Sequence, residues 1–238
     1  MTKKLKSLSA PAFWHIQKKR STWTASPSSG PHKKFESIPL SIILRNILKV
    51  AETGKEARTI IHNGDVFVDN KVVKDTSYPV GLFDTLHIPK EKKCYRMVPV
   101  KSGLKLIEIG ERESNVKIVR INDKTILKGK KIQLNFSDGK NVLTDSSDYK
   151  VGDCVLLELP SLKILKLIKL KAGTKGIVVK GASSGKIGTV KNVKSGSITQ
   201  PSKVACNLEG EDEEILKERF FLLGEDKPLI TVSGTHGQ

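Results

Sequence analysis

The residues best suited to a chemical task in this chain are basic side chains interleaved with aromatic rings. Near the N-terminus, Trp14 and Trp23 flank the run Lys18-Lys19-Arg20. Aromatic rings stack on unpaired bases while lysine and arginine neutralise phosphates, so this mixture indicates contact with RNA. The alternative is a solvated tail whose aromatic rings dock on the next domain. The candidate RNA-binding residues of this segment are Lys3, Lys4, Lys6, Trp14, His15, Lys18, Lys19, Arg20, Trp23, His32, Lys33 and Lys34.

A second basic group falls on a predicted helix and a predicted hairpin. Lys55, Arg58 and His62 follow at i, i+3 and i+7, which places them on one face of a helix. Two helices followed by a hairpin would place Lys71 and Lys74 beside them around one concave corner. Arg58 is the strongest candidate, because a planar guanidinium binds phosphate through two hydrogen bonds. The alternative for each lysine is the solvated face of an amphipathic helix.

A third basic group surrounds a glycine-rich segment, within residues 159–208 that contain ten lysines and no acidic residue. A nucleotide-binding P-loop is excluded, because only three residues separate Gly181 from Gly185 and Ile187 stands where that motif needs Ser or Thr. The lysines are candidate phosphate contacts, and the alternative is the surface of a small barrel. The acidic run Glu209 to Glu214 that follows is interpreted as a solvated loop. The candidates are Lys180, Lys186, Lys191 and Lys194.

Histidines and cysteines, in contrast, show no catalytic or metal-binding spacing. Cys94, Cys154 and Cys206 lie more than fifty residues apart, which argues against a disulfide framework or a zinc site and predicts reduced thiols. The positions of the residues suggest no nucleophile and base, and no pair of carboxylates. We therefore expect no enzyme activity, no metal, no cofactor and no small-molecule substrate.

The charge of the whole chain points to a polyanionic partner. Its 238 residues carry 42 Lys and Arg against 25 Asp and Glu, a formal net charge of +17, which favours nucleic acid or an anionic membrane. No run approaches the roughly 18 apolar residues of a spanning helix, and the first residues, Met1 to Lys4, contain no apolar signal core. We expect a cytoplasmic protein that does not bind membranes.

Local patterns predict the elements that position the second basic group. A second helix begins at the capping box of Thr53 and Glu56 and ends at Gly64. Residues 66–74, with the turn Asp69-Asn70 in the middle, have the spacing of a tight hairpin. The first helix is predicted from an apolar stripe at i, i+3, i+4, i+7, i+8 and i+11, which consists of Leu40, Ile43, Leu44, Ile47, Leu48 and Ala51.

Outside these elements the chain alternates between turn-rich and strand-like segments. Residues 1–36, rich in Pro and Ser, have too few apolar residues for a core and predict a disordered extension. Short apolar runs from Cys94 to Leu170 predict a small antiparallel β domain. The stretch from Leu162 to Lys171 is ambiguous, because a lysine at every third residue also suits a short basic helix on a membrane.

The run from Gly54 to Asp75 resembles the S-four-type RNA-binding domain of ribosomal proteins, pseudouridine synthases and some synthetases. With its flanks, it resembles over about residues 4 to 195 the archaeal and eukaryotic small ribosomal subunit protein family S-four-e. Val179 to Val190 resembles the KOW motif of ribosomal proteins and transcription factors. The flanking signatures are Ser9-Ala10-Pro11 with Trp14, Pro27 to His32, Pro39-Leu40 with Leu44-Arg45, Pro79 to Asp84, Lys131 to Asn135, and Asp138 to Asn141.

The resemblance implies a structural constituent of the small ribosomal subunit, bound to ribosomal RNA and to neighbouring ribosomal proteins in translation and subunit assembly. It assigns RNA contacts to Arg45, Lys55, Arg58, Lys71 and Lys74. The family pattern usually has Gly where this chain has Asn70, and Asn also tolerates the positive φ of a primed turn. The fold class expected is α+β and multi-domain, with a disordered basic extension (1–36), an αα-plus-β-hairpin RNA-binding module (37–93), a small antiparallel β domain (94–172), an SH3-like KOW β-barrel (173–230) and a C-terminal tail (231–238).

Two other functions stay open at this point. A pseudouridine synthase would need an aspartate in a Gly-Arg-Leu-Asp type motif, which Gly81-Leu82-Phe83-Asp84 matches only without the Arg. The residues that follow are also too few and too rich in short strands for that catalytic domain. A non-ribosomal RNA chaperone or elongation factor could carry a KOW barrel, although the order of the two modules favours the ribosome.

Overall fold

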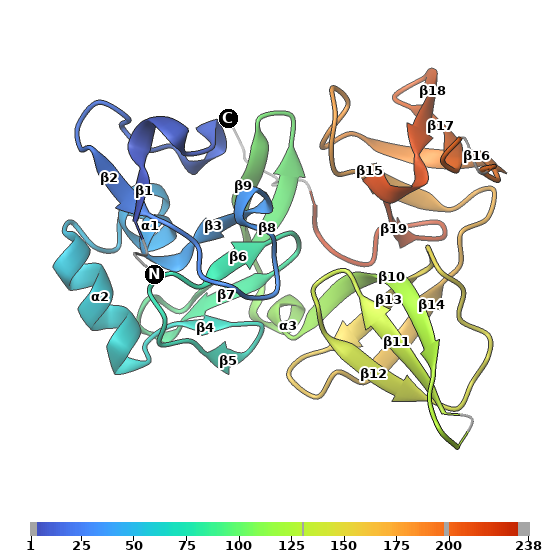
Figure 1. Ribbon diagram of the computed structural model, residues 1–238. Coiled ribbons are helices and arrows are strands. Elements are labelled where there is room, and N and C mark those ends of the chain that lie inside the picture. Colours follow the sequence, from blue (N-terminus) through green and yellow to red (C-terminus); the bar gives the residue numbers. More distant parts are fainter. Residues whose placement is uncertain (1–3, 130, 198–199, 233–238) are drawn as a thin grey trace. The chain divides into compact units, whose positions relative to one another are not determined.

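The computed structural model describes residues 4–129, 131–197 and 200–232 (Figure 1). The chain forms two compact units, one of residues 1–97 with 104–115 and the other of residues 98–103 with 116–238. Both are built mainly of antiparallel β-strands. The expected fold class was α+β. The described residues are mostly β, and their α-helices are short and lie in the first unit.

The first unit is organised around a five-stranded sheet of order β5-β4-β7-β8-β9. From the sequence, the residues of β8 and β9 were assigned to the central β domain (94–172). In the structure these strands extend the sheet that contains the β4–β5 hairpin. Strands β3 (Ser37–Pro39) and β6 (Pro79–Gly81) pair separately. The sheet consists of β4 (Phe67–Val68), β5 (Lys71–Val72), β7 (Thr85–Ile88), β8 (Lys93–Val100) and β9 (Gly103–Ile109). The helices are α1 (Leu40–Ile42), continued by a π-helical turn (Ile43–Ile47), α2 (Gly54–Asn63), α3 (Glu111–Ser114) and the 3-10 turn Pro89–Glu91.

The first predicted helix is shorter than its apolar stripe. The Leu48 N–H donates to the Ile43 carbonyl at 2.9 Å, the i to i−5 bond of a π-helical turn. Lys49 then takes a φ of 57°, which ends the helix. Leu40, Ile43, Leu44 and Ala51 of the stripe are buried, whereas Ile47 and Leu48 are only partly buried, so the stripe predicted most of the buried positions and overestimated the length of the helix.

The N-terminal segment is ordered from residue 4 onward, so the prediction of a disordered extension is wrong there. The Trp14 side chain is 0% exposed, packs in the same core cluster as Ile38 and Leu40, and its Nε1 donates to the Ser37 carbonyl at 2.9 Å. This burial offsets the entropy lost when the segment is fixed. The alternative, aromatic docking on the next domain, is correct for Trp14. The segment contains β1 (Lys4–Lys6), β2 (Trp23–Ala25) and the 3-10 turns Ser7–Ser9, Ala12–Trp14 and Lys34–Glu36.

The second unit contains two five-stranded antiparallel sheets, and the first of them lies within the span 94–172 that was expected to form a small antiparallel β domain. The ambiguous lysine-rich stretch contains a strand, β14, rather than a helix. The first sheet, of order β12-β11-β10-β13-β14, consists of β10 (Val116–Ile126), β11 (Ile132–Phe136), β12 (Asn141–Thr144), β13 (Cys154–Glu158) and β14 (Ile164–Ile168). The second, of order β18-β17-β16-β15-β19, consists of β15 (Lys175–Val178), β16 (Ile187–Lys194), β17 (Lys203–Leu208), β18 (Glu211–Leu216) and β19 (Phe220–Gly224), with the 3-10 turn Lys217–Arg219 before β19.

All three cysteines are buried free thiols. Burial raises the pKa of Cys154 to about 12 and that of Cys206 to about 11, and it also raises the pKa of Cys94. Because the thiolate is the reactive form, we expect iodoacetamide at about pH 8 to leave all three unmodified in the folded protein. In concentrated guanidinium chloride all three should react. Intact-protein mass spectrometry counts the adducts, and alkylation of a thiol in the folded chain would contradict its burial.

Candidate nucleic-acid interface

Helix α2 begins and ends at the capping residues that its sequence predicts. The Thr53 hydroxyl oxygen accepts a hydrogen bond from the Glu56 N–H at 3.2 Å, and Glu56 Oε2 accepts one from the Glu52 N–H at 2.9 Å. At the other end, Gly64 takes a φ of 82°, a left-handed conformation that suits glycine. Capping at both ends fixes the helix, so its surface side chains have defined directions.

Burial of one side of α2 directs the basic residues of the other side to solvent. Ala57 and Ile61 are each 0% exposed and hold the helix against the core. Lys55, Arg58 and His62 are all exposed, as their spacing predicted. Among the ion pairs of the described residues, none joins Lys55 or Arg58 to a carboxylate. Their charges are therefore open to a partner.

The β4–β5 hairpin carries the next predicted contact, Lys71, on an exposed strand. Asp69 and Asn70 form its turn with φ of 50° and 58°, the two positive angles of a type I′ turn. The Asp69 Oδ1 atom accepts a hydrogen bond from the Thr85 N–H at 3.1 Å, and Asn70 Nδ2 donates to Asn115 Oδ1 at 2.7 Å. The register, in which Val68 pairs with Lys71, confirms the tight hairpin, and the two side-chain bonds attach its turn to the rest of the unit.

Arg45 and Lys74 lie at opposite ends of α2. A Cβ atom added to Gly54, the first residue of the helix, would lie 3.4 Å from Arg45 Nη1. One added to Gly64, the C-cap, would lie 3.7 Å from Lys74 Cε. A basic side chain therefore lies beside each end of the helix, and together with Lys55 and Arg58 on its exposed side they give a surface that suits an anionic partner. The α2 face is defined here as Arg45, Lys55, Arg58, His62 and Lys74.

Comparison with known proteins identifies the family. Family models match in three consecutive stretches, the RS4NT (NUC023) domain at residues 1–35, the S4 domain at 38–86 and the ribosomal family S4e at 91–164. The small ribosomal subunit protein eS4 of Methanosphaera stadtmanae is 41% identical over 236 residues, which is 98% of this chain and 96% of that protein. The chain belongs to the S4e family of ribosomal proteins.

Other relatives agree with this assignment. The protein of the same name from Archaeoglobus fulgidus is 39% identical to this chain, over 94% of this chain and 96% of that protein. The crystal structure of the 30S ribosomal protein S4e from Thermoplasma acidophilum has a TM-score of 0.70 at 29% identity, and the match covers 80% of this chain and 96% of that one. The resemblance to the S-four-e family stated from the sequence is confirmed.

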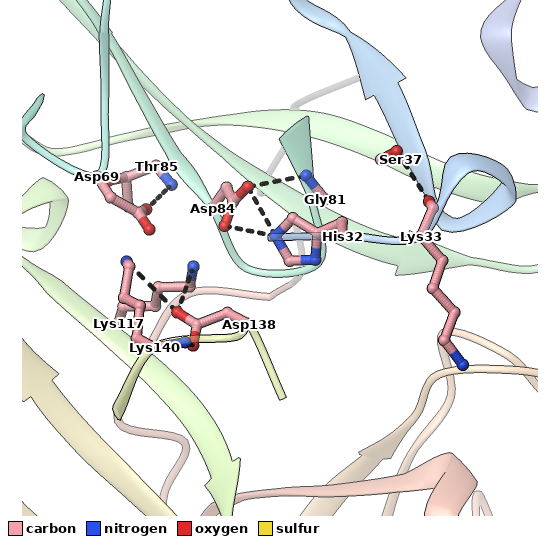
Figure 2. Close-up of polar contacts among 10 residues, drawn as sticks. All are labelled: His32, Lys33, Ser37, Asp69, Gly81, Asp84, Thr85, Lys117, Asp138 and Lys140. Atoms are coloured by element: carbon pink, nitrogen blue, oxygen red, sulfur yellow. Dashed lines mark hydrogen bonds and ion pairs between the residues drawn. The ribbon is translucent and has the colours of Figure 1, made fainter. Parts of the chain in front are cut away.

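Two N-terminal residues predicted to bind RNA are turned into the S4e fold, Trp14 fully buried and His32 partly buried. Trp14, fully buried, presents no ring face on which a base could stack. The His32 side chain is 9% exposed, and its Nε2 lies 2.9 Å from Asp84 Oδ2, which also accepts a hydrogen bond from the Gly81 N–H at 2.8 Å (Figure 2). Both predictions are therefore corrected, because these side chains attach the segment to the domain instead of facing solvent.

The other N-terminal candidates of the S4e chain stay on its surface where the structure describes them. Phe35 was not among the candidate RNA-binding residues predicted from the sequence. Its side chain is 63% exposed, and Lys34 Nζ lies 5.7 Å from the centre of its ring. Its only signal in the sequence is its place after two lysines. Lys4 lies in β1, and Lys3 falls outside the described residues. Exposed or half-exposed residues are Lys6, His15, Lys18, Lys19, Arg20, Trp23, Lys33 and Lys34.

The lysines of the C-terminal sheet face carboxylates, contrary to the expectation of a purely basic surface. The acidic run is not a solvated loop, since most of it forms β18, and β17 separates β18 from the lysine-bearing β16. Hydrogen bonds from the lysines lower the pKa of two of these carboxyls, Asp212 and Glu214. The pairs are Lys186 with Glu209 at 3.2 Å, Lys191 with Asp212 at 2.6 Å, and Lys194 with Glu214.

These pairs make Lys186, Lys191 and Lys194 weaker candidates for phosphate contact than the α2 face, because RNA would have to displace a carboxylate at each. Lys180 is exposed.

Among the described residues, no three His, Cys, Asp or Glu side chains are grouped as a metal site requires. No helix in the described part of the S4e chain is long and apolar enough to cross a membrane.

Proposed function

We propose that this S4e chain is a structural protein of the small ribosomal subunit that binds ribosomal RNA and catalyses no reaction. The α2 face carries the proposal, because cationic side chains gather around one capped helix and Lys55 and Arg58 have no carboxylate partner in the described residues. Phosphates fit such a surface, since each contact releases condensed counterions. The relatives are named as small ribosomal subunit proteins, which supports the same place for this chain.

The C-terminal sheet is assigned to a KOW barrel of the SH3-like type. Its support is five antiparallel strands together with Gly181 and Gly185, whose φ angles of 110° and 88° fall where other residues are strained. Glycine at these positions permits the tight loop of the motif. Neighbouring ribosomal proteins are the further partners of the chain, and the cytoplasm is its compartment.

Arg58→Ala is expected to weaken binding to purified small-subunit RNA by about 1–3 kcal/mol, because a charge-assisted contact is lost. The slope of log affinity against log salt should fall by about 0.7–0.9 for the one phosphate released. Filter binding over a series of salt concentrations measures both quantities, and circular dichroism checks the fold. Unchanged affinity in a folded variant would show that the α2 face is not the RNA surface.

A matched pair of lysines separates a specific contact from general charge loss. Lys55→Ala removes a lysine of the α2 face, whereas Lys90→Ala removes an exposed lysine that lies 2.6 Å from Asp65 Oδ2. Both lower the net charge by one, but only the first should weaken RNA binding. Equal losses would mean that net charge, and not the α2 face, determines affinity.

Cofractionation tests the ribosomal assignment itself. The full chain should stay with small ribosomal subunits through a high-salt wash, because contacts distributed over several basic segments do not release together. A non-ribosomal RNA-binding factor would be recovered away from the particles. A pseudouridine synthase would form pseudouridine in added RNA, and detection of that product would overturn the non-enzymatic role.

A further inference from the structure

The β10–β11 hairpin, with β12 alongside, extends beyond the β13 and β14 side of its sheet. β10 pairs with β13 only from Val116 to Arg120, whereas its pairing with β11 continues to Ile126 (Figure 1). The part of β10 past Arg120 therefore has a strand on one side only, and it forms a ribbon together with β11 and β12. A ribbon of this kind can reach a surface that a flat sheet cannot.

The tip of this hairpin carries apolar side chains in solvent. Ile126 is 75% exposed and Leu127 is 38% exposed. The Leu127 N–H donates to the Lys131 carbonyl at 2.8 Å, a backbone bond that joins the two strands at the tip. Nothing lies within 4 Å of a Cβ atom added at Gly129. Exposed apolar residues at a strand end favour aggregation, so their place here indicates a partner that covers them.

Lysines surround these apolar residues. Residues 124–131 include four lysines and no acidic residue. Lys128 and Lys131 are exposed, and neither takes part in an ion pair of the described residues. Lys124 differs, because its Nζ donates to the Ser147 carbonyl at 3.0 Å and so ties the hairpin to the segment that precedes β13. The charge at the tip complements an anionic partner.

We infer that the tip of the β10–β11 hairpin is a second RNA contact, in which Ile126 and Leu127 pack on unpaired bases and Lys128 and Lys131 contact the flanking phosphates. The inference rests on the proposed function. Apolar side chains gain nothing from phosphates, and bases inside an A-form duplex are stacked out of reach, whereas loops and bulges present open base faces. The partner is therefore a loop or bulge of folded RNA.

Salt dependence separates the two kinds of contact at the tip. The double substitution Ile126→Ser with Leu127→Ser should weaken binding of small-subunit RNA by about tenfold and leave the salt slope unchanged, because apolar contacts release no counterions. Lys128→Ala with Lys131→Ala should lower the slope by about 1.4–1.8. Leu143→Ser is the matched control, since Leu143 is 58% exposed on β12 and no lysine flanks it. It should leave both quantities unchanged.

Arg58→Ala, measured alongside, separates failure of the inference from failure of the proposed function. If Arg58→Ala weakens binding and both hairpin variants bind normally, the hairpin contact is wrong and the α2 face stands. If the hairpin variants bind RNA normally but are lost from small-subunit particles, the tip contacts a protein and the inference is again overturned. If all variants bind as the unaltered chain does, neither surface binds RNA.

Discussion

Replacing Trp14 with alanine is expected to lower the free energy of unfolding of the first unit by about 3–5 kcal/mol. The side chain is fully buried in the same cluster as Ile38 and Leu40, and its indole donates to the Ser37 carbonyl. Its removal leaves a cavity and deprives that carbonyl of a buried donor. Urea unfolding measures the change. It is followed by circular dichroism and by the fluorescence of Trp23, which is the remaining tryptophan of the two in the chain.

Trp23→Ala is the matched control. It removes the same residue type from the same segment, but the Trp23 side chain is 52% exposed, and the expected change is below about 0.5 kcal/mol. A similar loss in both variants would contradict the difference in burial. An unchanged unfolding midpoint for Trp14→Ala would show that the N-terminal segment contributes nothing to the stability of the first unit.

The α2 helix and the β4–β5 hairpin could be predicted because their signals are local. Thr53 and Glu56 are three residues apart, and each satisfies a backbone N–H at the start of the helix. Asp69 and Asn70 are neighbours that both tolerate positive φ. Local backbone preferences of this kind do not depend on how distant parts of the chain pack, so the sequence alone was sufficient for these two elements.

The N-terminal segment could not be predicted in the same way, because its order depends on a distant partner. Trp14 donates to Ser37, which is 23 residues away, and His32 contacts Asp84, which is 52 residues away. Composition counts the apolar residues within a segment and predicts disorder when they are few. It does not count the core of the neighbouring domain, which supplies the apolar surface that this segment lacks.

The charge pattern failed for a related reason. Lys191 and Asp212 are 21 residues apart in the chain and 2.6 Å apart in the fold, because consecutive antiparallel strands bring them together. Charge counted along the chain therefore overstated the basic surface of the C-terminal sheet. A signal was present in Gly210, because glycine favours the tight turn that joins β17 to β18, in which Glu209 and Gly210 have φ of 53° and 100°.

Replacing Asp138 with asparagine is expected to lower the free energy of unfolding of the second unit by about 3–5 kcal/mol. Lys117 Nζ lies 3.2 Å from Asp138 Oδ2, and the two side chains are 1% and 2% exposed (Figure 2). Asparagine keeps the shape and can still accept the Lys140 N–H, which Asp138 Oδ1 accepts at 3.2 Å. The variant therefore removes one charge and leaves the Lys117 ammonium buried. Pulsed alkylation of Cys154 and Cys206 during urea unfolding reports on this unit.

Two further variants assign the loss to the buried charge. Lys140 Nζ lies 3.4 Å from the same oxygen, but its side chain is 19% exposed and partly solvated, so Lys140→Gln should cost less than about 1 kcal/mol. Adding Lys117→Met to Asp138→Asn removes both charges and should recover most of the stability, because an apolar side chain of similar length carries no desolvation penalty. A double variant as unstable as Asp138→Asn alone would place the loss in the Ser137–Gly139 turn, not in the buried ammonium.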